Sequence, residues 1–293
     1  APDDAIILGL KELEVGTGRL RRTHIHFAHV YKNQSGWEQF LSRFERPGKL
    51  YDLEFLVDDR GRRIAAFGHW AGFAGAAVAL MAWCRHKNRQ QPVLERITSR
   101  SDQSELVGEL KNNLDEHSVN PKAMVIGAKG RCGRGAIELF ESVGCEVLKW
   151  DLEETEQGGP FPEILDCDIF LNCVFIDRPV APFLNRDLLG SAGRVLSVVC
   201  DVSCDPYGDY NPVPIYDRCT TFDDPTVTIV DGENPLYLIA IDHLPSLLPK
   251  ESSEDFCKQL LPFLYQLDDL DRGVWKRAND LFESKLSLIG TGI

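Results

Sequence analysis

The chain has 293 residues, 43% of them hydrophobic and 26% charged, which is ordinary for a globular protein, and its length suits two domains. Its formal net charge is −13, so neither a nucleic acid nor an anionic membrane, each of which needs a basic face, is an expected partner. The nine cysteines are scattered without a CxxC pair, which indicates reduced thiols rather than a disulfide scaffold or a zinc site. Residues 1–4 are acidic and unlike a signal peptide, so we expect a cytoplasmic protein.

The first third of the chain combines short apolar runs with helical patterns. Residues 35–44 have helical spacing. Residues 65–83 are almost entirely apolar and long enough to span a membrane, but they are rich in Gly and Ala and contain His69. A buried helix packed closely against its neighbours is therefore the better interpretation of this segment. Four runs bounded by Gly, Pro or charged residues predict strands: 5–10, 24–28, 50–56 and 64–67.

The remainder of the chain alternates predicted strands with helices. Residues 90–118 have the pattern of an exposed helix and a linker, and the tail at 252–288 predicts two helices with Trp275 and Phe282 facing a core. The alternation indicates a parallel, doubly wound sheet. Its predicted strands lie at 123–126, 146–149, 168–174, 195–199, 226–230 and 236–241.

A glycine-rich turn follows the strand at 123–126. Its spacing is Gly127-x-x-Gly130-x-x-Gly133, and a helical pattern begins directly after it. Glycines allow a tight turn and a close approach to a bound group, and unpaired N–H groups at a helix start suit a phosphate. Asp151, at the end of the next strand, suits the ribose hydroxyls of NAD and would repel the 2′-phosphate of NADP. The pattern therefore predicts NAD binding, although a glycine turn without a ligand is an open alternative.

We expect an α/β fold with two Rossmann-like, doubly wound domains and a cleft between them. Residues 1–66 would form a substrate domain, completed by helices within 252–293, and residues 67–251 would form an NAD-binding domain with its connecting helices. The strand at 6–10 looks buried and would begin in mid-sheet as an unprotected edge. We therefore expect the first domain to be truncated at its N-terminus, with further residues normally preceding Ala1.

Candidate acid–base residues follow the first two predicted strands. Lys11 and His29 both lie near carboxyl ends of strands, where parallel sheets form their sites. His24 and His26 share one face of their strand and fit a structural role, as hydrogen-bonded residues. Metal binding by the three histidines is disfavoured because the alternation keeps them from meeting at one ion.

Two cysteines belong to the predicted dinucleotide site. Cys132 lies inside the glycine turn, and Cys173 lies at the end of the strand at 168–174. They are either inert small residues or a pair of thiols close enough to join under oxidation.

Beyond these features, the chain resembles the fungal NAD-dependent, lysine-forming saccharopine dehydrogenases, a family related to alanine dehydrogenase. The resemblance extends over nearly the whole chain. The segments that carry it are GLKE at 9–12, HFAH at 26–29, LYDLEFL at 50–56, GRR at 61–63, AGFAGAA at 71–77, GRCG at 130–133, KWD at 149–151, GGPF at 158–161 and IDHLPSLLP at 241–249.

The resemblance implies an oxidoreductase acting on a CH–NH bond, in the final step of lysine biosynthesis by the α-aminoadipate pathway. The family oxidises saccharopine with NAD, and water then splits the imine into lysine and 2-oxoglutarate. The resemblance assigns acid–base catalysis to Lys11 and His29, the same two residues that strand-end placement favours. A lysine base must lose its proton near neutral pH, which burial or neighbouring cations would promote by lowering its pKa.

The resemblance also implies binding residues, and no metal site is expected. Saccharopine would contact Gln34, Phe67, Ser203, Cys204 and Asp205. NAD would contact Arg62, Gly130, Arg131, Asp151, Thr155, Phe175, Val202, Ile241, Asp242, His243 and Leu244.

The resemblance implies that family members carry about seventy further residues before the segment that matches Ala1. The chain therefore departs from the family at its start. Two alternatives to the enzyme therefore stay open: a truncated, non-catalytic relative, and a secondary-metabolism oxidoreductase acting on a different imine. We expect a monomer or weak oligomer whose partners are small molecules, namely saccharopine, lysine and 2-oxoglutarate.

Overall fold

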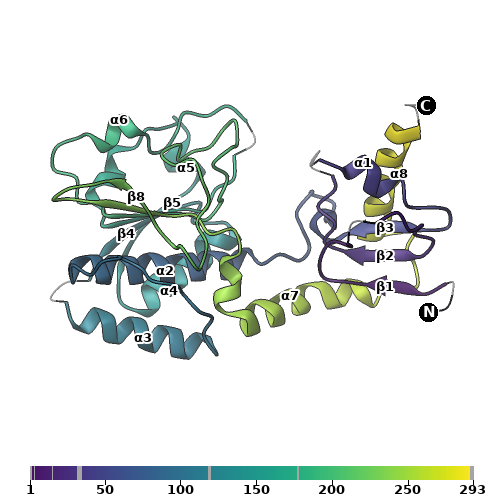
Figure 1. The fold of residues 1–293 in the computed structure, drawn as a ribbon, viewed down its shortest axis with the longest axis horizontal. Helices are drawn as coiled ribbons and strands as arrows, with labels where there is room; N and C mark the ends of the chain where they lie inside the picture. The colour runs from purple at the N-terminus through teal and green to yellow at the C-terminus, as the bar shows by residue number, and fades with distance from the viewer. Residues whose placement is uncertain are drawn as a thin grey trace. The chain divides into compact units, whose positions relative to one another are not determined.

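The computed structural model describes residues 2, 4–14, 16–31, 35–117, 120–176 and 178–290. The chain divides into two compact units. The first unit comprises Ala1–Ala66 and Asp255–Ile293, and the second comprises Phe67–Glu254. Each unit has its own sheet, so each is described by itself (Figure 1).

The first unit is built on a three-stranded parallel sheet in the order β1-β2-β3. Helix α8 packs on β3, where the ring of its fully buried Trp275 meets Tyr51 at 5.4 Å between centroids. Phe282 of α8 is buried against Phe44 at 5.3 Å, so the prediction that Trp275 and Phe282 face a core is confirmed. The elements are β1 (Ile6–Leu8), β2 (Thr23–His26), α1 (Trp37–Leu41), β3 (Lys49–Asp52), η1 (Leu53–Phe55) and α8 (Gly273–Gly290), with α7 (Pro249–Leu264) entering from the second unit.

Three expectations for this unit are wrong in detail. The strand predicted at 50–56 ends at Asp52, because the side chain of Asp52 accepts the backbone N–H of Glu54 and starts the 3-10 turn η1. Residues 64–67 form no strand and lead into helix α2 instead. Strand β1 is an edge strand, and its Ile6 and Leu8 side chains are exposed rather than buried.

The second unit is a six-stranded sheet in the order β5-β4-β6-β7-β9-β8. All neighbouring pairs are parallel except β8 and β9, so the expectation of an all-parallel sheet is wrong at one edge. Only residues 231–235 separate β8 from β9, which is too short for a parallel crossover. The strands are β4 (Lys122–Ile126), β5 (Glu146–Trp150), β6 (Ile169–Asn172), β7 (Val198–Asp201), β8 (Val227–Val230) and β9 (Leu236–Ile239).

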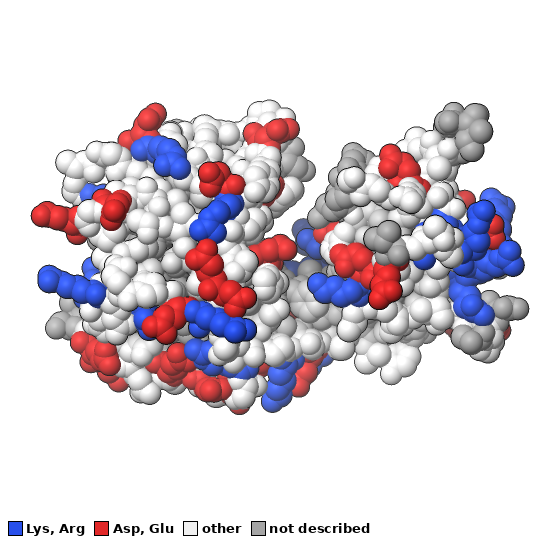
Figure 2. Space-filling model, in the orientation of Figure 1, with Lys and Arg blue, Asp and Glu red and all other residues white. Residues whose placement is uncertain are grey.

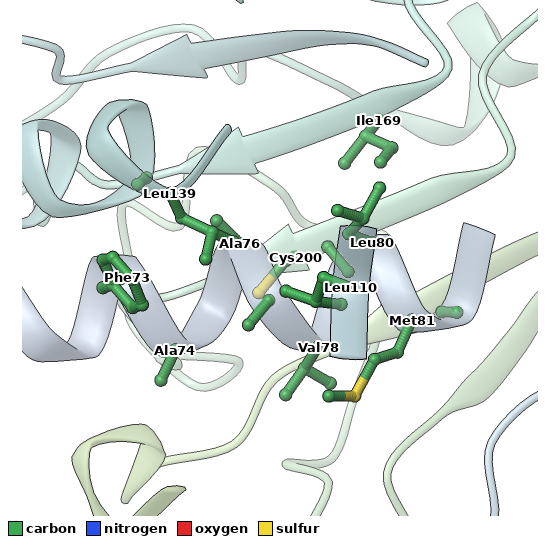
Figure 3. Packing of buried hydrophobic residues seen from close by; sticks show 14 of the residues in the cluster. Phe73, Ala74, Ala76, Val78, Leu80, Met81, Leu110, Leu139, Ile169 and Cys200 are labelled. Atoms are coloured by element: carbon green, nitrogen blue, oxygen red, sulfur yellow. The ribbon is translucent and has the colours of Figure 1, made fainter. Parts of the chain in front are cut away.

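Helices α2 (Gly68–Lys87), α3 (Gln103–Asp115) and α4 (Arg131–Ser142) lie on one face of this sheet (Figure 1). Fourteen residues of α2 are buried, which confirms the expected buried helix. Figure 3 shows part of this cluster, in which residues of α2 such as Phe73 and Leu80 lie with Leu139 of α4. The helices α2 and α4 pack at backbone distance: a Cβ on Gly72 would lie 1.8 Å from the carbonyl oxygen of Cys132. In the described part of the chain, no helix combines the length and apolar character that crossing a membrane requires.

A second hydrophobic core covers the opposite face of the same sheet. It includes Met124 and Ile126 of β4 and Phe170 of β6, all fully buried. Both faces of the sheet are therefore covered, as in a doubly wound fold. The short elements of the unit are α5 (Leu152–Thr155), η2 (Pro162–Asp166), α6 (Arg186–Leu189) and η3 (Leu244–Leu247).

Candidate active site

His29 is paired with a buried carboxylate in the first unit. Its Nδ1 lies 2.9 Å from Oε2 of Glu54, whose side chain is 9% exposed. Its other ring nitrogen, Nε2, lies 3.4 Å from Oε1 of the exposed Glu12. A carboxylate on Nδ1 favours a proton there, fixes the orientation of the ring and leaves Nε2 to exchange protons. This is the arrangement of a general acid–base histidine.

Asp52 holds the backbone next to His29 and at Glu54. One oxygen, Oδ1, accepts the N–H of Ala28 at 3.3 Å and the N–H of Glu54 at 3.0 Å. Asp52 is 1% exposed, and burial raises the pKa of its carboxyl group. The bond at Ala28 directly precedes His29, which has a φ of 53° in the left-handed region. Asp52 therefore restrains the two segments that present His29 and Glu54.

Lys11 and His29 both lie where the strands of the sheet have their carboxyl ends. Each residue comes three positions after a strand, and Leu8 of β1 pairs in register with Ile25 of β2. The Lys11 side chain is exposed, and neither a hydrogen bond nor an ion pair to it is found among the described residues. Its link to His29 in this unit is the adjacent Glu12, which contacts the imidazole. The expected burial around a lysine base is therefore absent within the described part of this unit.

A pocket of about 400 Å³ opens beside His29 and Glu12. His29 and Glu12 line it together with Trp37, Phe40 and Arg43. Its size and its mixture of aromatic and charged side chains are typical of a small-molecule site. Gln34, the substrate residue that the family resemblance implied for this region, lies outside the described residues.

His24 and His26 are core residues of the same unit. Both are buried, their rings meet at 6.2 Å, and burial is the main cause that lowers the pKa of each. The sequence predicted hydrogen-bonded structural residues. The structure instead shows ring packing against Phe44 and Phe40, and Nδ1 of neither histidine has a hydrogen-bond partner among the described residues.

The glycine turn of the second unit lies between β4 and α4. Gly127 has a φ of 92°, which favours glycine, and a Cβ on Gly133 would lie 2.1 Å from the carbonyl oxygen of Gly127. Gly130 is the N-cap residue of α4, so the first N–H groups of this helix point towards the turn. A cradle this tight, at the N-terminus of a twelve-residue helix, fits the pyrophosphate of a dinucleotide.

Asp151 stands beside that turn at the end of β5. Its Oδ2 accepts the N–H of Lys129 at 2.7 Å, and its Oδ1 accepts the N–H of Leu152 at 3.0 Å. An ionised carboxylate has about four lone-pair positions, so acceptors remain for two ribose hydroxyls. The Lys129 ammonium is paired with Glu153, which leaves the surroundings acidic and unsuited to a 2′-phosphate. The residues present therefore fit NAD.

A buried carboxylate that the sequence analysis missed organises the end of β7. Asp201 is fully buried and accepts hydrogen bonds from Tyr216 Oη at 2.6 Å, Ser203 Oγ at 2.6 Å and Asn172 Nδ2 at 2.9 Å. The bond from Ser203 fixes the start of the segment at 203–205, which the resemblance assigned to substrate. An Asp at the carboxyl end of a central parallel strand was the available signal.

The structure separates the remaining expected cofactor residues into exposed and buried groups. Arg62 and Phe175 are exposed, as are Asp242 and His243. Ile241 and Leu244 are buried in the core, so they could reach a cofactor only through their backbone. Thr155 donates its hydroxyl to the carbonyl of Asp151 at 2.8 Å and so supports that residue locally. Gly130 is the N-cap residue of α4, Arg131 is its first residue, and Val202 packs partly buried against the core. Phe67, which the resemblance assigned to substrate, directly precedes α2.

Further features of the site come from the charges and the thiols. Arg63 contacts Oε1 of Glu54 at 3.5 Å, which the sequence analysis did not predict.

The thiol of Cys132 lies next to Cys173 and is the main cause that raises the pKa of Cys173. On the face drawn in Figure 2, acidic and basic side chains of the second unit are intermixed, in keeping with pairs such as Lys149–Glu141.

A doubly wound sheet, a glycine turn at a helix start and an acid after the next strand are the features of a dinucleotide-binding fold of the oxidoreductase type, and the geometry of the His29–Glu54 pair suits acid–base chemistry. The fold resembles that of an L-alanine dehydrogenase, with a TM-score of 0.57 over 90% of this chain and 70% of the other, at 14% identity. No protein-family profile matches the chain.

Sequence relatives identify the family. The chain is 48% identical to the NAD(+), L-lysine-forming saccharopine dehydrogenase of Yarrowia lipolytica, over 99% of this chain and 82% of that protein. It is 48% identical to the enzyme of the same name from Schizosaccharomyces pombe, over 97% of this chain and 81% of that protein. The chain belongs to the family of NAD-dependent, lysine-forming saccharopine dehydrogenases.

Proposed function

We propose that this protein catalyses the NAD-dependent oxidation of saccharopine, with water, to L-lysine and 2-oxoglutarate. The observation that carries the proposal is the His29–Glu54 pair at the edge of a parallel sheet, in a chain that belongs to this family. The reaction also yields NADH and one proton, which completes its balance. The cytoplasm is the proposed compartment.

The first unit supplies the proton transfers in this proposal. With Nδ1 bound to the buried Glu54, Nε2 of His29, whose neighbour Glu12 is exposed, accepts a proton from the water that attacks the imine and later returns one to the departing lysine nitrogen. Glu54 stabilises the imidazolium that forms in between. Lys11 is the base that keeps the secondary amine of saccharopine neutral before oxidation.

The second unit holds the cofactor in this proposal. Bound NAD would supply the acceptor for the hydride on the glutamyl Cα of saccharopine. The N–H groups at the start of α4 would bind its pyrophosphate, and the carboxylate of Asp151 would bind its ribose hydroxyls. Ser203 and Asp205 are proposed substrate contacts, and Ser203 is held in place by its bonds to Asp201.

The test is a steady-state assay of the full-length protein with saccharopine. The expected result is NADH formation with lysine and 2-oxoglutarate in equal amounts. Binding of NAD without turnover would contradict the proposal and would indicate a non-catalytic relative. Turnover of other secondary amines in preference to saccharopine would instead indicate a different imine substrate.

A further inference from the structure

Two thiols face each other beside the substrate segment of the second unit. The Sγ atoms of Cys204 and Cys219 are 3.3 Å apart, and both residues are partly exposed. A disulfide bond measures about 2.05 Å, so roughly 1.2 Å of movement would join the two sulfurs. This pair is separate from Cys132 and Cys173 at the glycine turn.

The backbone holds both cysteines in place. Cys204 follows Ser203, which is tied to Asp201, and has a φ of 48° in the left-handed region. Cys219 precedes Thr220, whose N–H and hydroxyl oxygen both bond to Ala240, at 2.8 and 2.9 Å. Two anchored thiols need no large rearrangement to react with each other.

We propose that Cys204 and Cys219 form a thiol-oxidation site that a hydroperoxide converts to a disulfide. The Cys219 thiolate attacks one peroxide oxygen, which breaks the O–O bond, gives a sulfenic acid on Cys219 and releases hydroxide. The Cys204 thiol then attacks that sulfur, the S–S bond forms, and water leaves. The sum is two thiols and H₂O₂ giving one disulfide and two waters.

The geometry of the two thiols in their reduced form explains why Cys219 reacts before Cys204. The Cys204 thiol lies 3.0 Å from the carbonyl oxygen of Ala240, to which it donates, and burial is the main cause that raises the pKa of Cys204. Cys204 is therefore protonated at neutral pH, so Cys219 is the residue that reacts first with peroxide. In the second step the proton of Cys204 leaves with the sulfenic hydroxyl group as water. Formation of the disulfide removes the bond to Ala240 and pulls on the segment at 203–205.

The consequence for catalysis rests on the proposed function, whereas formation of the disulfide does not. Ser203 and Asp205 flank Cys204 and are the proposed substrate contacts. We expect oxidation to lower kcat/KM for saccharopine by at least about tenfold, because small displacements of positioning groups are costly. Reduction with dithiothreitol should restore it.

Trypsin places the two cysteines on different peptides. Cleavage after Arg194, Arg218 and Lys250 yields 195–218, which contains Cys204 and the buried Cys200, and 219–250, whose one cysteine is Cys219. The full-length protein is treated with hydrogen peroxide, its free thiols are alkylated, and it is digested without reductant. Mass spectrometry should find the two peptides linked through Cys204.

Cys219→Ser tests the pair, and Cys257→Ser, at an exposed cysteine, is the matched control. Cys219→Ser should keep the activity of the reduced enzyme, lose the linked peptide and resist peroxide, whereas Cys257→Ser should behave like the unmodified chain. A peroxide-treated chain without the linked peptide, or with the link at Cys200, would overturn the site. A linked peptide in an enzyme that never turns over saccharopine would support the site and contradict only the proposed function.

Discussion

The imidazole Nδ1 of His29 lies 2.9 Å from the carboxylate of Glu54, which belongs to a 3-10 turn 25 residues further along the chain. The carboxylate is almost fully buried, and the ring beside it is more than one-third exposed. A buried acceptor that orients a reachable histidine is the geometry of an acid–base residue with its positioning partner. The proposed mechanism depends on this pair.

We predict that Glu54→Gln lowers kcat by about 10- to 100-fold, because a neutral amide holds the ring less firmly and stabilises the imidazolium less. The Kd for NAD should stay unchanged. Glu38→Gln, an equal charge change on the exposed face of α1, is the control and should leave kcat as it is. Wild-type kcat in Glu54→Gln would show that the pair is not used.

Asp52 offers a second test, since its bonds are made by one acceptor oxygen. Asp52→Asn keeps an oxygen for the N–H groups of Ala28 and Glu54, whereas Asp52→Ala leaves both without it. We expect Asp52→Ala to lose about 2–4 kcal/mol in the free energy of unfolding, and Asp52→Asn to lose much less. Urea unfolding measures both. Equal losses in the two variants would mean that the negative charge, rather than the acceptor, is what matters.

The cofactor preference depends on Asp151. The wild-type protein should bind NAD at least about tenfold more tightly than NADP, because the carboxylate accepts ribose hydroxyls and repels a 2′-phosphate. Asp151→Ala should narrow the difference, mainly by weakening NAD. Quenching of intrinsic fluorescence by each cofactor gives the affinities, with Glu156→Gln, at an exposed residue of the same segment, as the control. Equal or tighter binding of NADP by the wild type contradicts the assignment.

Stability should fall in mild acid because of His24. Burial lowers the pKa of His24 in the folded chain below its value of 6.5 in the unfolded chain. As the pH falls below about 6.5, the unfolded state binds more protons at this residue, and stability drops by up to about 1.4 kcal/mol per pH unit until the folded pKa is reached. His24→Leu should therefore unfold with a shallower pH dependence between pH 6.5 and 5. Parallel curves for the variant and the wild type would contradict this.

The sequence predicted those parts of the site that depend on local patterns. The turn from Gly127 to Gly133 needs small residues for steric reasons, so its spacing reveals it. Lys11 and His29 come directly after predicted strands, and carboxyl ends of parallel strands share one edge. Figure 1 shows β1, β2 and β3 side by side as this reasoning requires.

Residues whose roles depend on long-range contacts were not predicted. Glu54 reads as part of an apolar strand, and only the turn after Asp52 directs it to His29. Asp201 gains its role from hydrogen bonds to Tyr216 and Asn172, and the three residues belong to three separate segments of the chain. The antiparallel β8 was missed because strand alternation says nothing about direction, which the short connection to β9 decides.

The most direct test measures kcat and NAD affinity together in full-length His29→Gln and Lys11→Met. If these residues are the acid–base pair, each substitution should lower kcat for saccharopine by about 10²- to 10⁴-fold. The Kd for NAD should stay within about twofold, because the glycine turn and Asp151 belong to the other unit of the chain. Turnover of saccharopine at the wild-type rate in both variants would contradict the account, since no proton transfer would then pass through either side chain.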